Sequence, residues 1–213
     1  MSDIFREIDE ELRRDNFLKL WQRYGKYVIA LAVVVVAVTG LVVGWREYQA
    51  RQRQAEGVRF AAAVDMANQG KLKEAVNAFL AMSQSTTGGR ATLSRFAAGA
   101  LKAKEGDVPG ALAIYEQIAS DASNPQMYRD LATLFAARYT FDKDPKAALE
   151  RLKPLTDAAN PWHPSALELT ALVQLKLGDK DAAQKTYQAL ADDLTAPSGL
   201  RARAAEMVAA IGQ

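Results

Sequence analysis

The sequence contains no cysteine and only one histidine, His163. Without thiols the chain has no disulfide, no thiolate nucleophile and no cysteine ligand for a metal ion. A single imidazole also cannot build the usual zinc sites, and no Ser-His-Asp triad has support nearby. His163 lies in the turn-forming run NPWHP, where we expect it to cap a helix. The sequence therefore predicts a protein that is not an enzyme and holds no cofactor and no metal.

An excess of charge of one sign is also lacking. The chain has 27 Lys and Arg residues against 25 Asp and Glu, spread over its whole length. A nucleic-acid-binding face needs clustered basic residues, so no nucleic-acid partner is expected. Asp142, Asp144 and Asp157 lack the spacing and the glycine of a calcium loop, and Gly88-Gly89 lacks the Lys-Ser/Thr of a phosphate loop. We predict that the three aspartates are solvated turn residues and that Gly88-Gly89 is a linker between units.

One stretch has no charged residue at all: residues 27–45 read YVIALAVVVVAVTGLVVGW. As a helix this stretch spans about 28 Å, close to the ~30 Å hydrocarbon core of a bilayer. A buried core helix of this length would normally have a polar face. Aromatic residues stand near both ends, as in an interfacial belt: Trp21, Tyr24, Tyr27, Trp45 and Tyr48. We predict a transmembrane helix over residues 27–45.

A cleaved signal peptide does not fit this segment. The apolar run is longer than usual, acidic residues precede it, and Trp45-Arg46 stands where a cleavage site would need small residues. We therefore expect a permanent single-pass anchor in contact with membrane lipid. Lys and Arg flank both ends in similar numbers, so charge leaves the orientation of the anchor open.

The segments around the span have simpler signals. Residues 1–26 predict an amphipathic tail, with Ile4, Ile8 and Leu12 on one helix face. This tail would lie on the membrane surface or dock on a partner. Residues 46–55 predict a polar helical stalk. Within the span, Gly40 and Gly44 form a GxxxG motif, a spacing that lets two membrane helices pack closely and would support a homodimer.

Residues 56–213 contain an internal repeat of about 36 residues. The positions that recur at this spacing are the turn positions Gly70, Gly106, Asp142 and Gly178, the alanines Ala75, Ala111, Ala147 and Ala183, the residues four later, Phe79, Tyr115, Arg151 and Tyr187, and the prolines Pro125, Pro161 and Pro197. Glycine suits the left-handed end of a helix. Alanine suits a close helix crossing, and the aromatic residue one turn later fills the space between hairpins.

Each unit predicts two helices joined by the glycine turn. First helices are expected near residues 56–68, 90–104, 126–139 and 164–177, and a last helix over 199–211 would cap the open end. The predicted fold is all-α: a single N-terminal transmembrane helix followed by a solenoid of about four helical hairpins and a capping helix.

The second-helix pattern A-x-x-x-F/Y resembles the tetratricopeptide repeat. The residues that carry the resemblance are Ala75/Phe79, Ala111/Tyr115 and Ala183/Tyr187, with small residues at the first-helix position of the motif at Ala63, Gly99 and Ala171. The sequence departs from the motif in its period and in the third unit. There, Phe135 and Arg151 replace the small and the aromatic residue.

The whole chain is similar to the bacterial YfgM-type family of ancillary subunits of the SecYEG translocon. The similarity lies in the architecture and in the segment FREIDEELRRDNFLKLWQRYGKYVI, residues 5–29. It implies a bacterial inner-membrane protein with a cytoplasmic N-terminus and a periplasmic repeat domain. It also implies SecYEG and periplasmic chaperones as partners, and unfolded envelope proteins as clients whose export or folding the protein assists.

Exposed residues of the first helices would line the concave face of such a solenoid. The candidate peptide-binding residues are Phe60, Phe96, Lys104, Arg138 and Tyr139, although aromatic residues at such positions more commonly pack between hairpins. Two functions stay open. A chaperone-like accessory requires weak, promiscuous binding, whereas a static scaffold of a respiratory or cell-division complex requires one tight interface.

Overall fold

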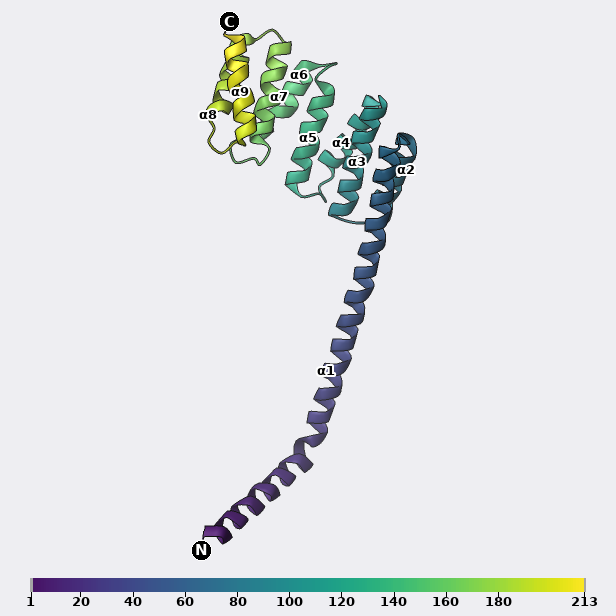
Figure 1. Ribbon diagram of the computed structural model, residues 1–213, viewed down its shortest axis with the longest axis vertical. Coiled ribbons are helices and arrows are strands. Elements are labelled where there is room, and N and C mark those ends of the chain that lie inside the picture. The colour runs from purple at the N-terminus through teal and green to yellow at the C-terminus, as the bar shows by residue number, and fades with distance from the viewer. Residues whose placement is uncertain (1, 213) are drawn as a thin grey trace. The chain divides into compact units, whose positions relative to one another are not determined.

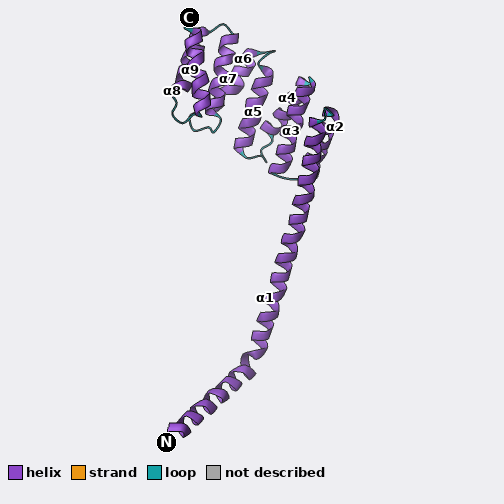
Figure 2. Cartoon of the chain, viewed as in Figure 1, coloured by secondary structure: helices purple, strands orange, loops and turns teal. Residues whose placement is uncertain are grey.

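A computed structural model describes residues 2–212, and the side chains of residues 18, 21–27, 29–31 and 33–212. Within these residues the chain forms helices and turns and no strand (Figure 2). The predicted all-α class is confirmed. The elements, labelled in Figure 1, are α1 (Ser2–Asn68), α2 (Leu72–Ser85), α3 (Gly89–Glu105), α4 (Val108–Ser120), α5 (Gln126–Thr140), α6 (Pro145–Leu152), the 3-10 helix η1 (Lys153–Leu155), α7 (His163–Lys176), α8 (Lys180–Asp192) and α9 (Ser198–Ile211).

The chain divides into two compact units, residues 1–57 and 58–213. The first unit is the part of α1 that ends at Gly57. Its side chains from Ile29 to Trp45 are exposed wherever they are described, and Leu41 keeps 74% of its surface exposed. One helix here is long and apolar enough to cross a membrane. The expected divisions into tail, span and stalk stay predictions, because α1 runs through all three without a break.

The second unit is a row of helical hairpins in which each helix from α2 to α9 packs against the next. Contacts between sequence neighbours are the mark of a repeat solenoid. Three hairpin turns contain a glycine with positive φ: Gly70 at 80°, Gly106 at 95° and Gly178 at 82°. In each turn the N–H groups of this glycine and of the next residue bond to carbonyls of the preceding helix. These bonds satisfy acceptors that a helix end otherwise leaves open.

The third hairpin turns without such a glycine. Asp142 stands at the glycine position, and no non-glycine residue in the described part of the chain has a positive φ. The end of α5 is followed by a longer turn, in which the N–H groups of Lys143 and Asp144 both bond to the carbonyl of Thr140. The next helix, α6, therefore starts one residue later than the 36-residue period predicts.

Counted from the N-cap, all four second helices bury the same positions. The N-caps are Lys71, Asp107, Asp144 and Asp179, and the fully buried alanines four residues later are Ala75, Ala111, Ala148 and Ala183. The expected Ala147 is partly exposed. Four residues further on, the buried side chains are Phe79, Tyr115, Leu152 and Tyr187. Leu152 thus takes the place for which the period predicts Arg151, and the longer turn is the cause of both differences.

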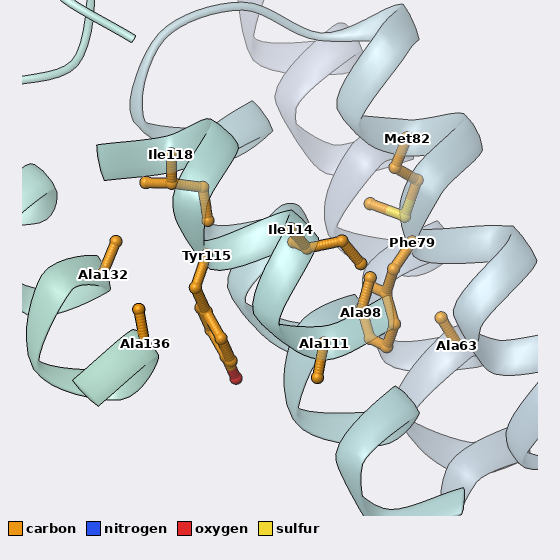
Figure 3. Close-up of a cluster of buried hydrophobic side chains, with 10 residues drawn as sticks. All are labelled: Ala63, Phe79, Met82, Ala98, Ala111, Ile114, Tyr115, Ile118, Ala132 and Ala136. Atoms are coloured by element: carbon orange, nitrogen blue, oxygen red, sulfur yellow. The ribbon is translucent and has the colours of Figure 1, made fainter. Parts of the chain in front are cut away.

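Buried side chains form three clusters along the row. The first cluster is shown in Figure 3, where the alanines Ala63, Ala98, Ala111, Ala132 and Ala136 lie around Phe79 and Tyr115. Helix α5 belongs to two clusters, since Ala132 and Ala136 pack into the first while Leu134 and Ala137 pack into the second. The second cluster also contains Leu169 and Val173 of α7, so α5 and α7 share this part of the core.

Candidate functional site

The aromatic candidates of the first helices lie against the core. The ring of Phe60 meets Phe79 edge-on, with centroids 5.0 Å apart. Phe96 lies 6.0 Å from Tyr115, and Tyr139 stacks on Tyr115 at 5.7 Å and 4°. All three candidates are half-buried, because they pack between hairpins. Their use by a ligand stays a prediction.

Tyr115 is the centre of this aromatic packing. Its side chain is buried, and burial, together with the neighbouring Tyr139, raises the pKa of its hydroxyl. The ring fits because α3 has no side chain at Gly99, where a Cβ would lie 2.9 Å from Cζ of Tyr115. Tyr115 is therefore a neutral packing residue and offers no ionised group to a ligand.

The charged candidates, Lys104 and Arg138, are exposed, and Arg138 lines a depression. A shallow groove of about 220 Å³ runs between α5 and α7. Its buried floor is formed by Leu134 and Leu169, and Phe135 and Leu172 stand at its rim with 36% and 39% of their surfaces exposed. The other groove residues are Arg138, Ser165 and Glu168. The structure thus combines Arg138 with two apolar residues that were not among the sequence candidates, whereas Lys104 lies outside this groove.

The two charged residues of the groove, Glu168 and Arg138, differ in whether their side chains are free to contact a ligand. Glu168 accepts from Nε and Nη2 of Arg203 in α9 at 3.0 and 2.9 Å, and this contact raises the pKa of Arg203. The guanidinium of Arg138 instead lies 5.8 Å from the ring centroid of Phe141. Cation–π contacts of this kind are weak at exposed positions. Arg138 is the cation of the groove that a ligand can reach.

Ion pairs join successive repeats at the surface. Arg151, displaced from the core position, pairs with Glu116 of α4 at 2.5 Å. Lys176 of α7 pairs with Asp142 at 2.9 Å, and its hydrogen bond lowers the pKa of that carboxyl. Such exposed pairs contribute little to stability. We infer that they instead help to align neighbouring hairpins.

The remaining polar candidates have structural contacts. His163 does not cap a helix as expected, because Trp162 is the N-cap of α7 and His163 is its first residue. Nδ1 of His163 lies 2.9 Å from the carbonyl oxygen of Thr156. Asp144 accepts from the N–H of Ala147, and Asp157 from that of Ala159. Within the described residues, no three histidine or acidic side chains come together in a way that could hold a metal ion. In α1, nothing in the structure lies within 4 Å of a Cβ placed at Gly40 or Gly44, so the role of these two glycines stays a prediction.

Phe135 could have been found from the sequence. It occupies the position where the other units have Ala63, Gly99 and Ala171, and a bulky side chain cannot enter the close crossing that those small residues make. Its ring packs beside Phe96 and Tyr115, with centroids at 6.0 and 5.2 Å, and extends to the surface. A large apolar residue at a position reserved for small ones was the available signal.

Comparison with known proteins agrees with this architecture. A search of curated proteins gave no significant match. The family model described as "Tetratricopeptide repeat-like domain" matches residues 19–207, which include part of the N-terminal helix and nearly all of the repeats. With its glycine turns, buried alanines and hairpin-by-hairpin packing, the chain belongs to the tetratricopeptide repeat-like domain family.

Proposed function

We propose that this protein is a membrane-anchored interaction protein whose repeat domain binds extended segments of partner proteins in the groove between α5 and α7. A tetratricopeptide repeat-like domain indicates a role in protein–protein interaction. The observation that carries the proposal is the groove itself, where Phe135 and Leu172 stay exposed above a floor of buried leucines. Apolar surface of this kind is retained at binding sites more often than elsewhere on a domain.

The chemistry of the groove favours a particular ligand. An apolar side chain of the partner would contact Phe135 and Leu172, and a backbone carbonyl or a carboxylate would accept from Arg138. Glu168 is already engaged by Arg203, whereas the side chain of Arg138 is exposed and can reach a ligand in the groove. Unfolded chains offer apolar side chains and free carbonyls together, and they suit a shallow groove better than a folded surface does.

The apolar segment of α1 supports anchoring in a membrane. Its exposed side chains from Ile29 to Trp45 would be covered by lipid, and a helix satisfies its own backbone groups there. The resemblance to the YfgM-type family supports a bacterial inner-membrane location with a cytoplasmic N-terminus. On this basis the protein assists SecYEG-dependent export or folding of envelope proteins, together with periplasmic chaperones.

Site-specific crosslinking in native membranes tests the groove. A photoreactive amino acid at position 172 of the full-length protein should crosslink to several newly exported, incompletely folded proteins. The same probe at Gln117, an exposed position of α4, is the control and should give few such products. Equal yields at both positions would contradict the groove assignment, and one dominant folded partner would indicate a static scaffold.

Binding should be weak, because the anchor concentrates the repeat domain at the membrane and makes strong affinity unnecessary. We expect dissociation constants in roughly the micromolar to millimolar range for unfolded envelope-protein peptides. Titration of the full-length protein in nanodiscs measures this, with Leu172→Asp as the variant expected to lose binding. Nanomolar affinity for a single peptide would contradict a chaperone-like role.

Protease accessibility tests the topology. Added to spheroplasts, a protease should digest the repeat domain and spare residues 1–26. Digestion of the tail alone would invert the proposed orientation.

A further inference from the structure

The N-terminal rim of the apolar span carries a surface that the peptide groove does not explain. We propose that α1 binds the headgroups of anionic phospholipids there, through Arg23 and Lys26. This inference rests on the proposed insertion of α1 in a bilayer. The ligand chemistry is a lipid phosphate carrying net negative charge, recognised by exposed cations that stand beside aromatic rings.

Charge is distributed unequally over the two rims. Residues 16–26 contain three basic residues, Lys19, Arg23 and Lys26, and no acid, whereas residues 46–56 contain three arginines and two glutamates. The net charges are therefore +3 (3 − 0) and +1 (3 − 2) over segments of equal length. Electrostatic attraction to an anionic leaflet follows net local charge, so it is concentrated at the N-terminal rim.

Helix geometry gathers these cations on one side. Residues three apart on an α-helix are separated by about 60° around its axis, so Arg23 and Lys26 form one stripe. Tyr24 and Tyr27 form a second stripe beside it by the same spacing. Both cations are exposed. Cζ of Arg23 lies 5.8 Å from the ring centroid of Tyr24, and Nζ of Lys26 lies 5.1 Å from that of Tyr27.

The aromatic residues set the depth at which the cations act. Trp21, Tyr24 and Tyr27 have exposed rings at this rim, and such rings prefer the headgroup region. The ring of Trp21 lies along the helix at Gly25, where a Cβ would be only 3.2 Å from it. Long basic side chains extend from this depth toward the phosphates. Arg23 and Lys26 are thus held at the level of the lipid charges.

Two of the three cations at the opposite rim, Arg51 and Arg53, are engaged within the helix. Nε of Arg51 donates to Glu47 at 3.0 Å, and Arg53 donates to Gln49 at 3.2 Å. These contacts and the lower net charge weaken their attraction to lipid. Arg51 and Arg53 therefore provide a matched control pair in the same helix.

Lipid selectivity of the reconstituted full-length protein tests the proposal. Spin-labelled phosphatidylglycerol and phosphatidylcholine report, by electron paramagnetic resonance, the ratio of their association constants at the protein surface. One basic residue at an anionic surface contributes a factor of about five. The double variant Arg23→Gln/Lys26→Gln should lower the ratio several-fold, toward one. The double variant Arg51→Gln/Arg53→Gln should change it much less, and Arg23→Lys/Lys26→Arg should retain the selectivity.

The outcomes separate the two proposals. A selectivity that depends on Arg23 and Lys26 and falls at high salt supports lipid binding at this rim. Equal losses of selectivity in both double variants would overturn the lipid site. The absence of lipid selectivity in the unchanged protein would also overturn it, and would favour an acidic protein surface as the partner of Arg23 and Lys26. Extraction of every variant by alkaline carbonate would show that α1 does not span the bilayer, and would overturn the anchor and the lipid site together.

Discussion

The second and third hairpins of the repeat domain reach the same packing through different turns. In the second hairpin, Gly106 ends α3 with a positive φ and Asp107 caps α4. In the third, Asp142 cannot adopt that conformation cheaply, and the turn takes one more residue before Asp144 caps α6. The buried alanine and the large residue one turn later then follow at the same distance from the cap.

This comparison teaches that the N-cap, and not the distance along the chain, sets which residues of a second helix are buried. A helix that starts one residue later presents its residues to the core one position later. Leu152 accordingly fills the space that Tyr115 fills in the preceding hairpin, and Arg151 is released to the surface. The irregular unit is therefore a displaced repeat with an intact core.

The largest expected effect distinguishes Leu152 from Arg151. Removing the buried side chain in Leu152→Ala should lower the free energy of unfolding by about 2–5 kcal/mol, and Tyr115→Ala in the regular hairpin by about 3–5 kcal/mol. Arg151→Ala removes only an exposed ion pair and should cost less than about 1 kcal/mol. Chemical denaturation monitored by circular dichroism measures all three. If Arg151→Ala lowered the free energy of unfolding strongly and Leu152→Ala did not, Arg151 would occupy the core position that the 36-residue period predicts, and the displaced repeat would be wrong.

Enlarging the alanines tests the same shift from the opposite direction. Ala148→Leu and Ala111→Leu should each overpack a helix crossing and cost about 1–3 kcal/mol. Ala147→Leu, at a partly exposed position, and Ala113→Leu, at an exposed one, should cost less than about 1 kcal/mol. Thermal melts compare Ala148→Leu with Ala147→Leu, and Ala111→Leu with Ala113→Leu. Equal melting temperatures for Ala147→Leu and Ala148→Leu would contradict the displaced repeat.

The turns themselves should respond differently to alanine. Gly106→Ala forces a side chain into the left-handed region and should cost about 1–2 kcal/mol. Asp142→Ala leaves a turn without positive φ and removes one exposed ion pair, so we expect a change within about 0.5 kcal/mol. Urea midpoints of the two variants provide the measurement. A large loss of stability in Asp142→Ala would contradict this expectation, and would show that the ion pair between Asp142 and Lys176 stabilises the turn.

The smallest expected effect concerns acid. A hydrogen bond from Lys102 and another from the N–H of Gly110 hold the pKa of Asp107 below its usual value. Because the folded-state pKa is the lower one, this contribution is present above the unfolded pKa of about 3.9 and is lost as the pH falls through the folded pKa. Asp107→Asn keeps a capping acceptor but cannot titrate, so its stability should fall less steeply below about pH 4.

Lys102→Met is the control for the acid experiment, since it removes the main cause of the lowered pKa while Asp107 still caps α4. Its stability should also depend less on pH in this range. An unchanged acid profile in both variants, measured by urea denaturation at a series of pH values, would contradict the assigned contact.

Much of the fold could be predicted because its signals are local. The predicted first helices over 90–104, 126–139 and 164–177 lie within one residue of the bounds of α3, α5 and α7. Most of these helix ends lie at turn glycines or prolines that are visible in the sequence. The candidate site was predicted less well. Arg138 lines the groove, but Phe60, Phe96 and Tyr139 pack against core residues, and nothing in their spacing distinguishes a packing ring from a binding one.

The sequence by itself determined the all-α class, the apolar segment and the positions of the regular repeats, because each depends on composition or on periodicity within one or two helices. Only the tertiary structure decided that α6 is displaced by one residue. The cost of a positive φ at Asp142 has to be weighed against a longer turn, and packing with neighbouring helices sets that balance. The groove likewise required the tertiary structure, since Phe135 and Leu172 lie on different helices and come together only when α5 packs beside α7.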